Sequence, residues 1–145
     1  MTIDRQGTGL AVLRICIGVF FVFEGIAKVR WLLDSSILAG QFSAWSSAAA
    51  TGSIAAWYLR RIAVPGLAIF ARLVPLGEFM SGLALVVGFW TPFVAFVAFF
   101  MASNYQIASG ALFKYSFLTS GYGLPVLGAT LALALGGARL PWSIR

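Results

Sequence analysis

The chain has 145 residues, of which 61% are hydrophobic and only 10% are charged, and its mean hydropathy is +0.95. This composition excludes an ordinary soluble globular protein, and the length suits one domain rather than two independent cores. The formal charge of +6 does not indicate nucleic acid, because Lys and Arg gather at the ends of apolar segments, where they suit anionic lipid headgroups. We therefore expect a protein of the cell membrane, with anionic lipids around it and no nucleic-acid partner.

Four apolar windows are long enough to cross a membrane as helices. They cover about residues 11–29, 66–88, 92–109 and 118–137, and each has roughly the 20 residues that a transmembrane helix needs. The first is interpreted as a retained helix and not as a signal peptide, since charges interrupt it and no small-residue cleavage pattern follows. The sequence therefore predicts an all-α, multi-pass four-helix bundle, one transmembrane domain over residues 1–145, with both termini on one side.

The connection between the first two windows, about residues 31–65, is too apolar to be a free loop. Asp34 and Ser35 can cap a short helix. Leu38, Phe42 and Trp45 share one face of this helix. A second short helix is expected to begin at Ile54. Both are predicted to be interfacial helices that either lie on the membrane or cap the bundle.

The scarcity of metal-binding and nucleophilic side chains excludes several kinds of chemistry. Cys16 is the only cysteine and there is no histidine, which excludes an internal disulfide, a cysteine cluster, a His-ligated haem and a Ser-His-Asp triad. With only four acidic residues, a carboxylate-bridged metal centre is not expected either. We expect no metal site, and any redox cofactor should be organic and lipid-soluble, such as a quinone, or belong to a partner chain.

Ionisable residues inside the windows are expected to face inward and to pair, because each costs roughly 2.5–3.5 kcal/mol at the centre of a transmembrane helix. Counting depth from window midpoints near residues 20 and 77 predicts one polar layer toward the long connection, with an ion pair between Glu24 and Arg72. This candidate ligand-binding cluster comprises Glu24, Lys28, Arg72, Asn104 and Tyr122. The same count places Arg14 and Glu78 toward the opposite half, where they are predicted to form a structural ion pair.

Small residues are expected to let neighbouring helices approach closely. Gly18 and Gly25 share one face of the first window with Arg14 and Lys28. In the second window the predicted small-residue stripe is Gly77, Ser81, Ala84 and Gly88.

Three segments together resemble the DoxX family of small four-span membrane proteins. They are LRICIGVFFVFEGIAKV, GEFMSGLALVVGFWTP and LALALGGARLPWS. The residues that carry the resemblance are Arg14, Gly18, Gly25, Lys28, Glu78, Gly82 and Gly88. The family includes the small membrane subunit of a thiosulfate:quinone oxidoreductase, so the resemblance implies a subunit of a membrane redox complex.

Three functions remain open on the sequence. The first is a redox-complex subunit that contacts quinone, with Arg72, Asn104 or Tyr122 donating to the carbonyls and Glu24 accepting or supplying a proton. The second is a non-catalytic accessory subunit, in which the same cluster is structural glue. The third is a small transporter. Whether the chain takes part in catalysis is left open.

Both leading interpretations predict a hetero-oligomer with other membrane-complex subunits. Aromatic residues carry much of the energy of packed interfaces, so the expected contact surfaces are the short helix bearing Phe42 and Trp45 and the face from Phe93 to Phe100. Orientation stays open. The positive-inside rule weakly favours a cytoplasmic long connection, whereas the resemblance implies cytoplasmic termini.

Overall fold

The computed structural model describes residues 5–144, which form helices joined by turns and contain no strand. The predicted all-α class is therefore confirmed. In chain order the elements are α1 (Arg5–Ala27), the 3-10 helix η1 (Val29–Leu32), α2 (Ser36–Ala48), α3 (Ile54–Tyr58), the π-helical η2 (Leu59–Ala63), α4 (Leu67–Val87), α5 (Thr91–Ala108), α6 (Tyr115–Thr119) and α7 (Leu124–Gly136).

Three helices of the described chain, α1, α4 and α5, are long and apolar enough to cross a membrane by length and composition. The fourth window differs from its prediction, because residues 118–137 are split between α6 and α7. Gly121 and Gly123 weaken a helix at the break, and Pro125 has no amide hydrogen for the carbonyl four residues back, so it suits only a first helical turn. The apolar helix α7 has 13 residues, about 20 Å of length.

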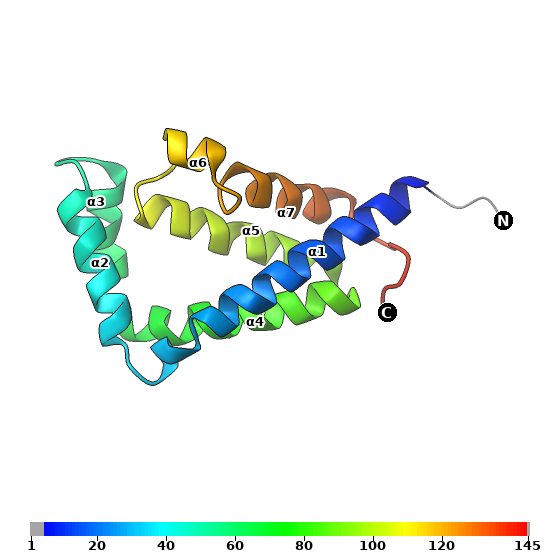
Figure 1. Cartoon of the computed structure of the whole chain (residues 1–145), viewed down its shortest axis with the longest axis horizontal. Coiled ribbons are helices and arrows are strands. Elements are labelled where there is room, and N and C mark those ends of the chain that lie inside the picture. Colours follow the sequence, from blue (N-terminus) through cyan, green and yellow to red (C-terminus); the bar gives the residue numbers. More distant parts are fainter. Residues whose placement is uncertain (1–4, 145) are drawn as a thin grey trace.

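The long helices lie side by side, and the short helices α2 and α3 lie across one end of them (Figure 1). The start of α1 and the C-terminal segment lie at the other end, as predicted. We call α2, α3 and η2 the cap. Their buried residues pack against the ends of α4 and α5 in a small core of Leu38, Phe42, Leu59, Ala63, Ala71 and Ala108. Of the two arrangements left open for the short helices, the structure has the one that caps the bundle.

Local hydrogen bonds explain where the cap helices begin. Of the two predicted caps of α2, the Asp34 carboxylate accepts from the Ser36 amide at 2.9 Å, whereas the Ser35 side chain makes no cap hydrogen bond. The Ser53 hydroxyl accepts from the Ala56 amide at 3.2 Å and caps α3. Both bonds satisfy an amide that has no partner within its own helix.

Glycines set the contact between α1 and α4. A Cβ on Gly82 would lie 2.5 Å from the backbone nitrogen of Val22 and 2.7 Å from the carbonyl oxygen of Gly18. A Cβ on Gly25 would lie 2.7 Å from the nitrogen of Phe79. Only glycine permits such close backbone contact between membrane helices. The predicted stripe on α4 is therefore only partly right, because Gly82 is the residue against α1.

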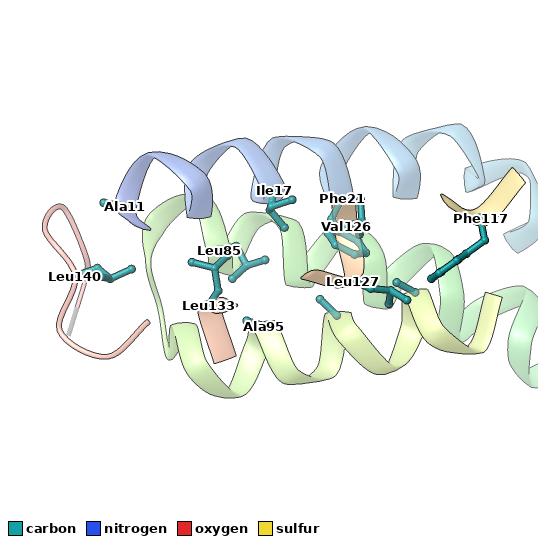
Figure 2. Close-up of a cluster of buried hydrophobic side chains, with 12 residues drawn as sticks. Ala11, Ile17, Phe21, Leu85, Ala95, Phe117, Val126, Leu127, Leu133 and Leu140 are labelled. Atoms are coloured by element: carbon teal, nitrogen blue, oxygen red, sulfur yellow. The ribbon is translucent and has the colours of Figure 1, made fainter. Parts of the chain in front are cut away.

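The main core lies between α1, α4, α5 and α7 (Figure 2). Its large side chains are Phe21 from α1, Leu85 from α4 and Leu133 from α7, all fully buried. On α5 the corresponding buried positions are alanines, Ala95, Ala98 and Ala102. Small residues on one helix and large ones on its neighbours allow close packing, which replaces the hydrophobic effect as the force between helices in lipid.

Candidate functional site

Three ionisable side chains from α1, its C-terminal end and α4 form one cluster, which we call the Lys28 triad. The Lys28 ammonium lies 2.6 Å from a carboxylate oxygen of Glu24 and 2.7 Å from one of Glu78. The Tyr122 hydroxyl donates to the other oxygen of Glu78 at 3.2 Å. The exposed fraction of the side chain is 2% for Glu78, 11% for Lys28 and 32% for Glu24. The triad is thus buried from the α4 side and open toward Glu24.

The predicted depths were wrong because the two helices are not centred on each other. Gly82 lies between Gly18 and Val22, so residue 82 of α4, and not residue 77, is level with residue 20 of α1. Five residues of helix correspond to about 7 Å. This shift brings Glu78 beside Glu24 and moves Arg72 beyond them, toward the cap.

Arg72 therefore does not belong to the cluster. Its side chain is exposed, and its guanidinium donates to the carbonyl oxygen of Ala68 on its own helix at 3.3 Å. Within residues 5–144 both ion pairs involve Lys28. The predicted Glu24–Arg72 pair is wrong, and Lys28 takes the place of the arginine.

The predicted pair between Arg14 and Glu78 is also wrong. Arg14 is fully buried near the terminal end of the bundle. It donates to the carbonyl oxygen of Trp142 at 2.8 Å and to the hydroxyl of Ser143. Since residue 82 is level with residue 20, Arg14 lies beside Gly88, and Glu78 is more than two helical turns away along α4.

Asn104 lies where α5 meets the cap, and its partner is Tyr58 of α3. The Tyr58 hydroxyl donates to the side-chain oxygen of Asn104. Burial raises the pKa of Tyr58, and the hydrogen bond to Asn104 offsets part of this rise. Tyr58 is therefore a neutral donor at physiological pH, and the amide group of Asn104 is left to donate elsewhere.

A cavity lies between the cap and the bundle, and both polar groups and aromatic rings line it. We call it the capped cavity. Its polar walls are Lys28, Glu78, Tyr58 and Asn104, and its aromatic walls include Trp31, Phe42, Trp45, Phe70 and Tyr105. Its volume is about 40 Å³, which is room for a few water molecules. Two predicted residues line it directly, Lys28 and Asn104, while Glu24 and Tyr122 support it through the triad.

An apolar groove of about 450 Å³ runs between α4 and α5 on the outer face of the bundle. We call it the α4–α5 groove. Its walls include Gly77, Phe93, Phe96 and Phe100. The groove and the capped cavity share four lining residues, Phe70, Val74, Met101 and Asn104. The polar cavity therefore adjoins a surface that faces the membrane.

Two residues of this site were not identified from the sequence. Glu78 was assigned to the other half of the bundle, although aligning Gly18 and Gly25 with Gly82 would have placed it beside Lys28. Tyr58 is not among the residues that the sequence predicts for the cluster. Its position follows from the fold of the cap over α5, and no local sequence signal indicates it.

Comparison with known proteins identifies the family. No curated protein and no solved structure matches the chain. The family model named DoxX matches residues 9–110. This range includes α1 from its fifth residue on, the cap, α4, α5, the whole Lys28 triad and all residues that line the capped cavity. The chain is thus a membrane protein that belongs to the DoxX family.

Proposed function

We propose that this DoxX protein is a membrane subunit of a redox complex and that it binds a quinone. The head group would lie in the capped cavity and the apolar tail in the α4–α5 groove. The observation that carries this proposal is the wall shared by the two spaces, which joins polar groups to a lipid-facing apolar surface. A ligand with a polar ring and a long apolar tail fits that combination.

The polar walls supply donors for quinone carbonyls. The side-chain oxygen of Asn104 accepts from Tyr58, so its amide hydrogens remain available to donate to a ligand. Lys28 lines the same cavity and uses two of its three protons in the triad. These two groups replace Arg72 as the donors that we propose for the carbonyls.

Space for the head group requires a side chain to move. The capped cavity holds about 40 Å³, less than a quinone ring needs. Met101 and Phe70 separate it from the groove. An unbranched methionine adapts its shape at small cost, so we propose that Met101 moves aside when the ring binds.

The triad suits proton exchange with a bound quinone. Two carboxylates share one ammonium, so the three groups carry a formal charge of −1 when all are ionised, and one proton makes them neutral. Reduction of a quinone to a quinol takes two electrons and two protons. The electrons must come from an electron-carrying partner subunit, which is why the proposal includes a hetero-complex.

An accessory role without chemistry is the second candidate, and the small size of the capped cavity favours it. In that role the triad only holds α1 to α4. The α2 surface expected to contact a partner does not fit either role, because Phe42 is 6% exposed and packs inside the cap. Phe93, Phe96 and Phe100 are exposed on α5 and remain available to a tail or to a partner.

Binding of a short-chain benzoquinone to the purified chain tests the proposal. Trp31 and Trp45 line the cavity, so a bound quinone should quench tryptophan fluorescence in a saturable way. Asn104→Ala removes one donor and should weaken binding about tenfold, the effect of about 1.4 kcal/mol. Ser103→Ala, the neighbouring position outside both spaces, is the matched control and should leave binding unchanged.

Absence of saturable quenching in the unaltered protein would contradict the quinone assignment and support the accessory role. Equal binding by both variants would place the quinone elsewhere. Native mass spectrometry from the protein's own membrane tests the partner separately, because both candidate roles require a second kind of polypeptide.

A further inference from the structure

A second polar centre lies at the terminal end of the bundle, far from the Lys28 triad. Arg14 is fully buried there, and within residues 5–144 its hydrogen-bond acceptors are the Trp142 carbonyl and the Ser143 hydroxyl, which are both uncharged. Within residues 5–144 the buried side-chain atoms without a hydrogen-bond partner are Nε of Arg14 and Oγ1 of Thr91. A buried cation without a counter-charge is costly, so a negative group beside it would stabilise the fold.

A hollow of about 360 Å³ opens next to this cation. We call it the terminal hollow. Gly88 and Ser143 belong to its wall and also border Arg14, since a Cβ on Gly88 would lie 2.0 Å from the Arg14 guanidinium and 2.6 Å from the Ser143 hydroxyl. Because glycine at position 88 has no side chain, the Arg14 guanidinium can lie next to the terminal hollow.

The other polar features of the terminal hollow also favour an anion. Arg139 and Thr91 line it, and none of its described lining residues is acidic. Trp90 precedes α5 without a side-chain hydrogen bond to the first amides of that helix. Amides at a helix start carry partial positive charge and suit phosphate oxygens, although Pro92, in the first turn of α5, has no amide hydrogen to donate. Arg139, the hydroxyls of Thr91 and Ser143 and a helix start thus line one hollow, and the guanidinium of Arg14 lies next to it.

An apolar groove adjoins the terminal hollow on the surface of the bundle. A groove of about 410 Å³ is lined by α4 and α5 and shares Trp90 with the hollow. Its other walls include Met80, Phe93 and Val97. Trp90 and Trp142 are 66% and 65% exposed at this end, and exposed tryptophans are typical of the headgroup level of a membrane.

We propose that the terminal hollow binds the phosphate group of one anionic phospholipid, with an acyl chain along the groove beyond Trp90. The phosphate contacts Arg139, Ser143 and the start of α5, and it supplies the negative charge that Arg14 lacks among the described residues. A lipid is favoured over a free phosphate ion because an apolar groove adjoins the anion site at Trp90. This site is independent of the proposed quinone site, which lies at the capped end.

The experiment uses the full chain, purified in detergent and depleted of lipid. Phosphatidylglycerol, phosphatidylcholine or inorganic phosphate is added, and native mass spectrometry and the thermal unfolding midpoint are recorded. We expect phosphatidylglycerol to remain bound as one molecule and to raise the midpoint more than the other two. Equal effects of the two lipids would overturn the proposal, and so would inorganic phosphate acting as strongly as phosphatidylglycerol.

Matched charge variants locate the lipid. Arg139→Gln alters the exposed wall of the hollow without touching the buried Arg14 and should weaken phosphatidylglycerol binding about fivefold. Arg60→Gln removes the same charge from an exposed position on the cap, at the other end, and should change binding less than twofold. An equal loss in both variants would mean that general charge attraction holds the lipid, which overturns a specific site.

Discussion

Removing the ammonium from the Lys28 triad should damage the protein far more than removing a carboxylate. Lys28→Met leaves the carboxylate of Glu78 buried, with only the Tyr122 hydroxyl as a hydrogen-bond partner. Glu78→Gln instead leaves the Lys28–Glu24 pair neutral and intact, and the glutamine keeps an oxygen that can accept from Lys28. The two variants thus alter one contact from opposite sides with opposite effects on charge.

The magnitudes follow from burial. Breaking a buried pair by removing one partner costs on the order of 3–5 kcal/mol. For Lys28→Met we expect about 3 kcal/mol, because Glu78 is only 2% exposed whereas Glu24 is 32% exposed and regains water. Glu78→Gln should cost at most about 1 kcal/mol, since its hydrogen bonds can be kept. The double variant leaves only Glu24 ionised, so it should recover about 2 kcal/mol of the loss caused by Lys28→Met.

Equilibrium unfolding of the purified chain in mixed micelles, followed by tryptophan fluorescence, measures these free energies. The two single variants and the double variant form a thermodynamic cycle. If Glu78→Gln destabilises the protein as much as Lys28→Met, the Lys28 ammonium does not stabilise the fold by neutralising the buried Glu78 carboxylate. The same conclusion holds if the double variant loses the sum of the two single losses, because the two groups would then not interact.

Two further predictions test the helix contacts. Gly18→Ala should lower the free energy of unfolding by about 1–3 kcal/mol, because the new Cβ would lie 2.7 Å from the nitrogen of Val86. Gly9→Ala on the same helix is the control. A Cβ at residue 9 would have no heavy atom within 4 Å, so this variant should raise the free energy of unfolding by up to about 1 kcal/mol. Equal effects of the two alanines would argue against this contact between α1 and α4. Arg72→Gln should change the free energy of unfolding by less than about 0.5 kcal/mol, since Arg72 is exposed and donates to the Ala68 carbonyl on its own helix. A loss of several kcal/mol would instead support the buried Glu24–Arg72 ion pair that the sequence predicted.

The lengths of the apolar segments were enough to predict most of the long helices. The windows 66–88 and 92–109 agree with α4 and α5 to within a residue, because glycine turns bound both apolar runs. The fourth window failed because an average over apolar residues does not register the turn at Gly121 and Gly123. A hydropathy average cannot detect a helix break when the residues at the break are themselves apolar or small.

The residues of the candidate site could not all be predicted, because they depend on which residues of α1 lie level with which residues of α4, and composition does not reveal this register. Span midpoints assume that helices share a centre, but α1 begins at Arg5 and is offset along α4. The true register is set by the backbone contact at Gly82, a residue outside the stripe that spacing suggested. Lys28 and Asn104 were found because polar residues in apolar segments are conspicuous, whereas Tyr58 required the tertiary fold of the cap.

The way the C-terminal segment is held affects how this protein should be tagged. The Trp142 carbonyl and the Ser143 hydroxyl accept from Arg14, and the Ile144 amide donates to the Val87 carbonyl at 3.0 Å. A bulky reporter fused directly behind these residues would pull on the two acceptors that residues 5–144 provide for the buried Arg14 guanidinium. Gly52 offers a better insertion point for topology mapping, because it lies in an exposed turn of the cap with nothing within 4 Å of its Cβ position.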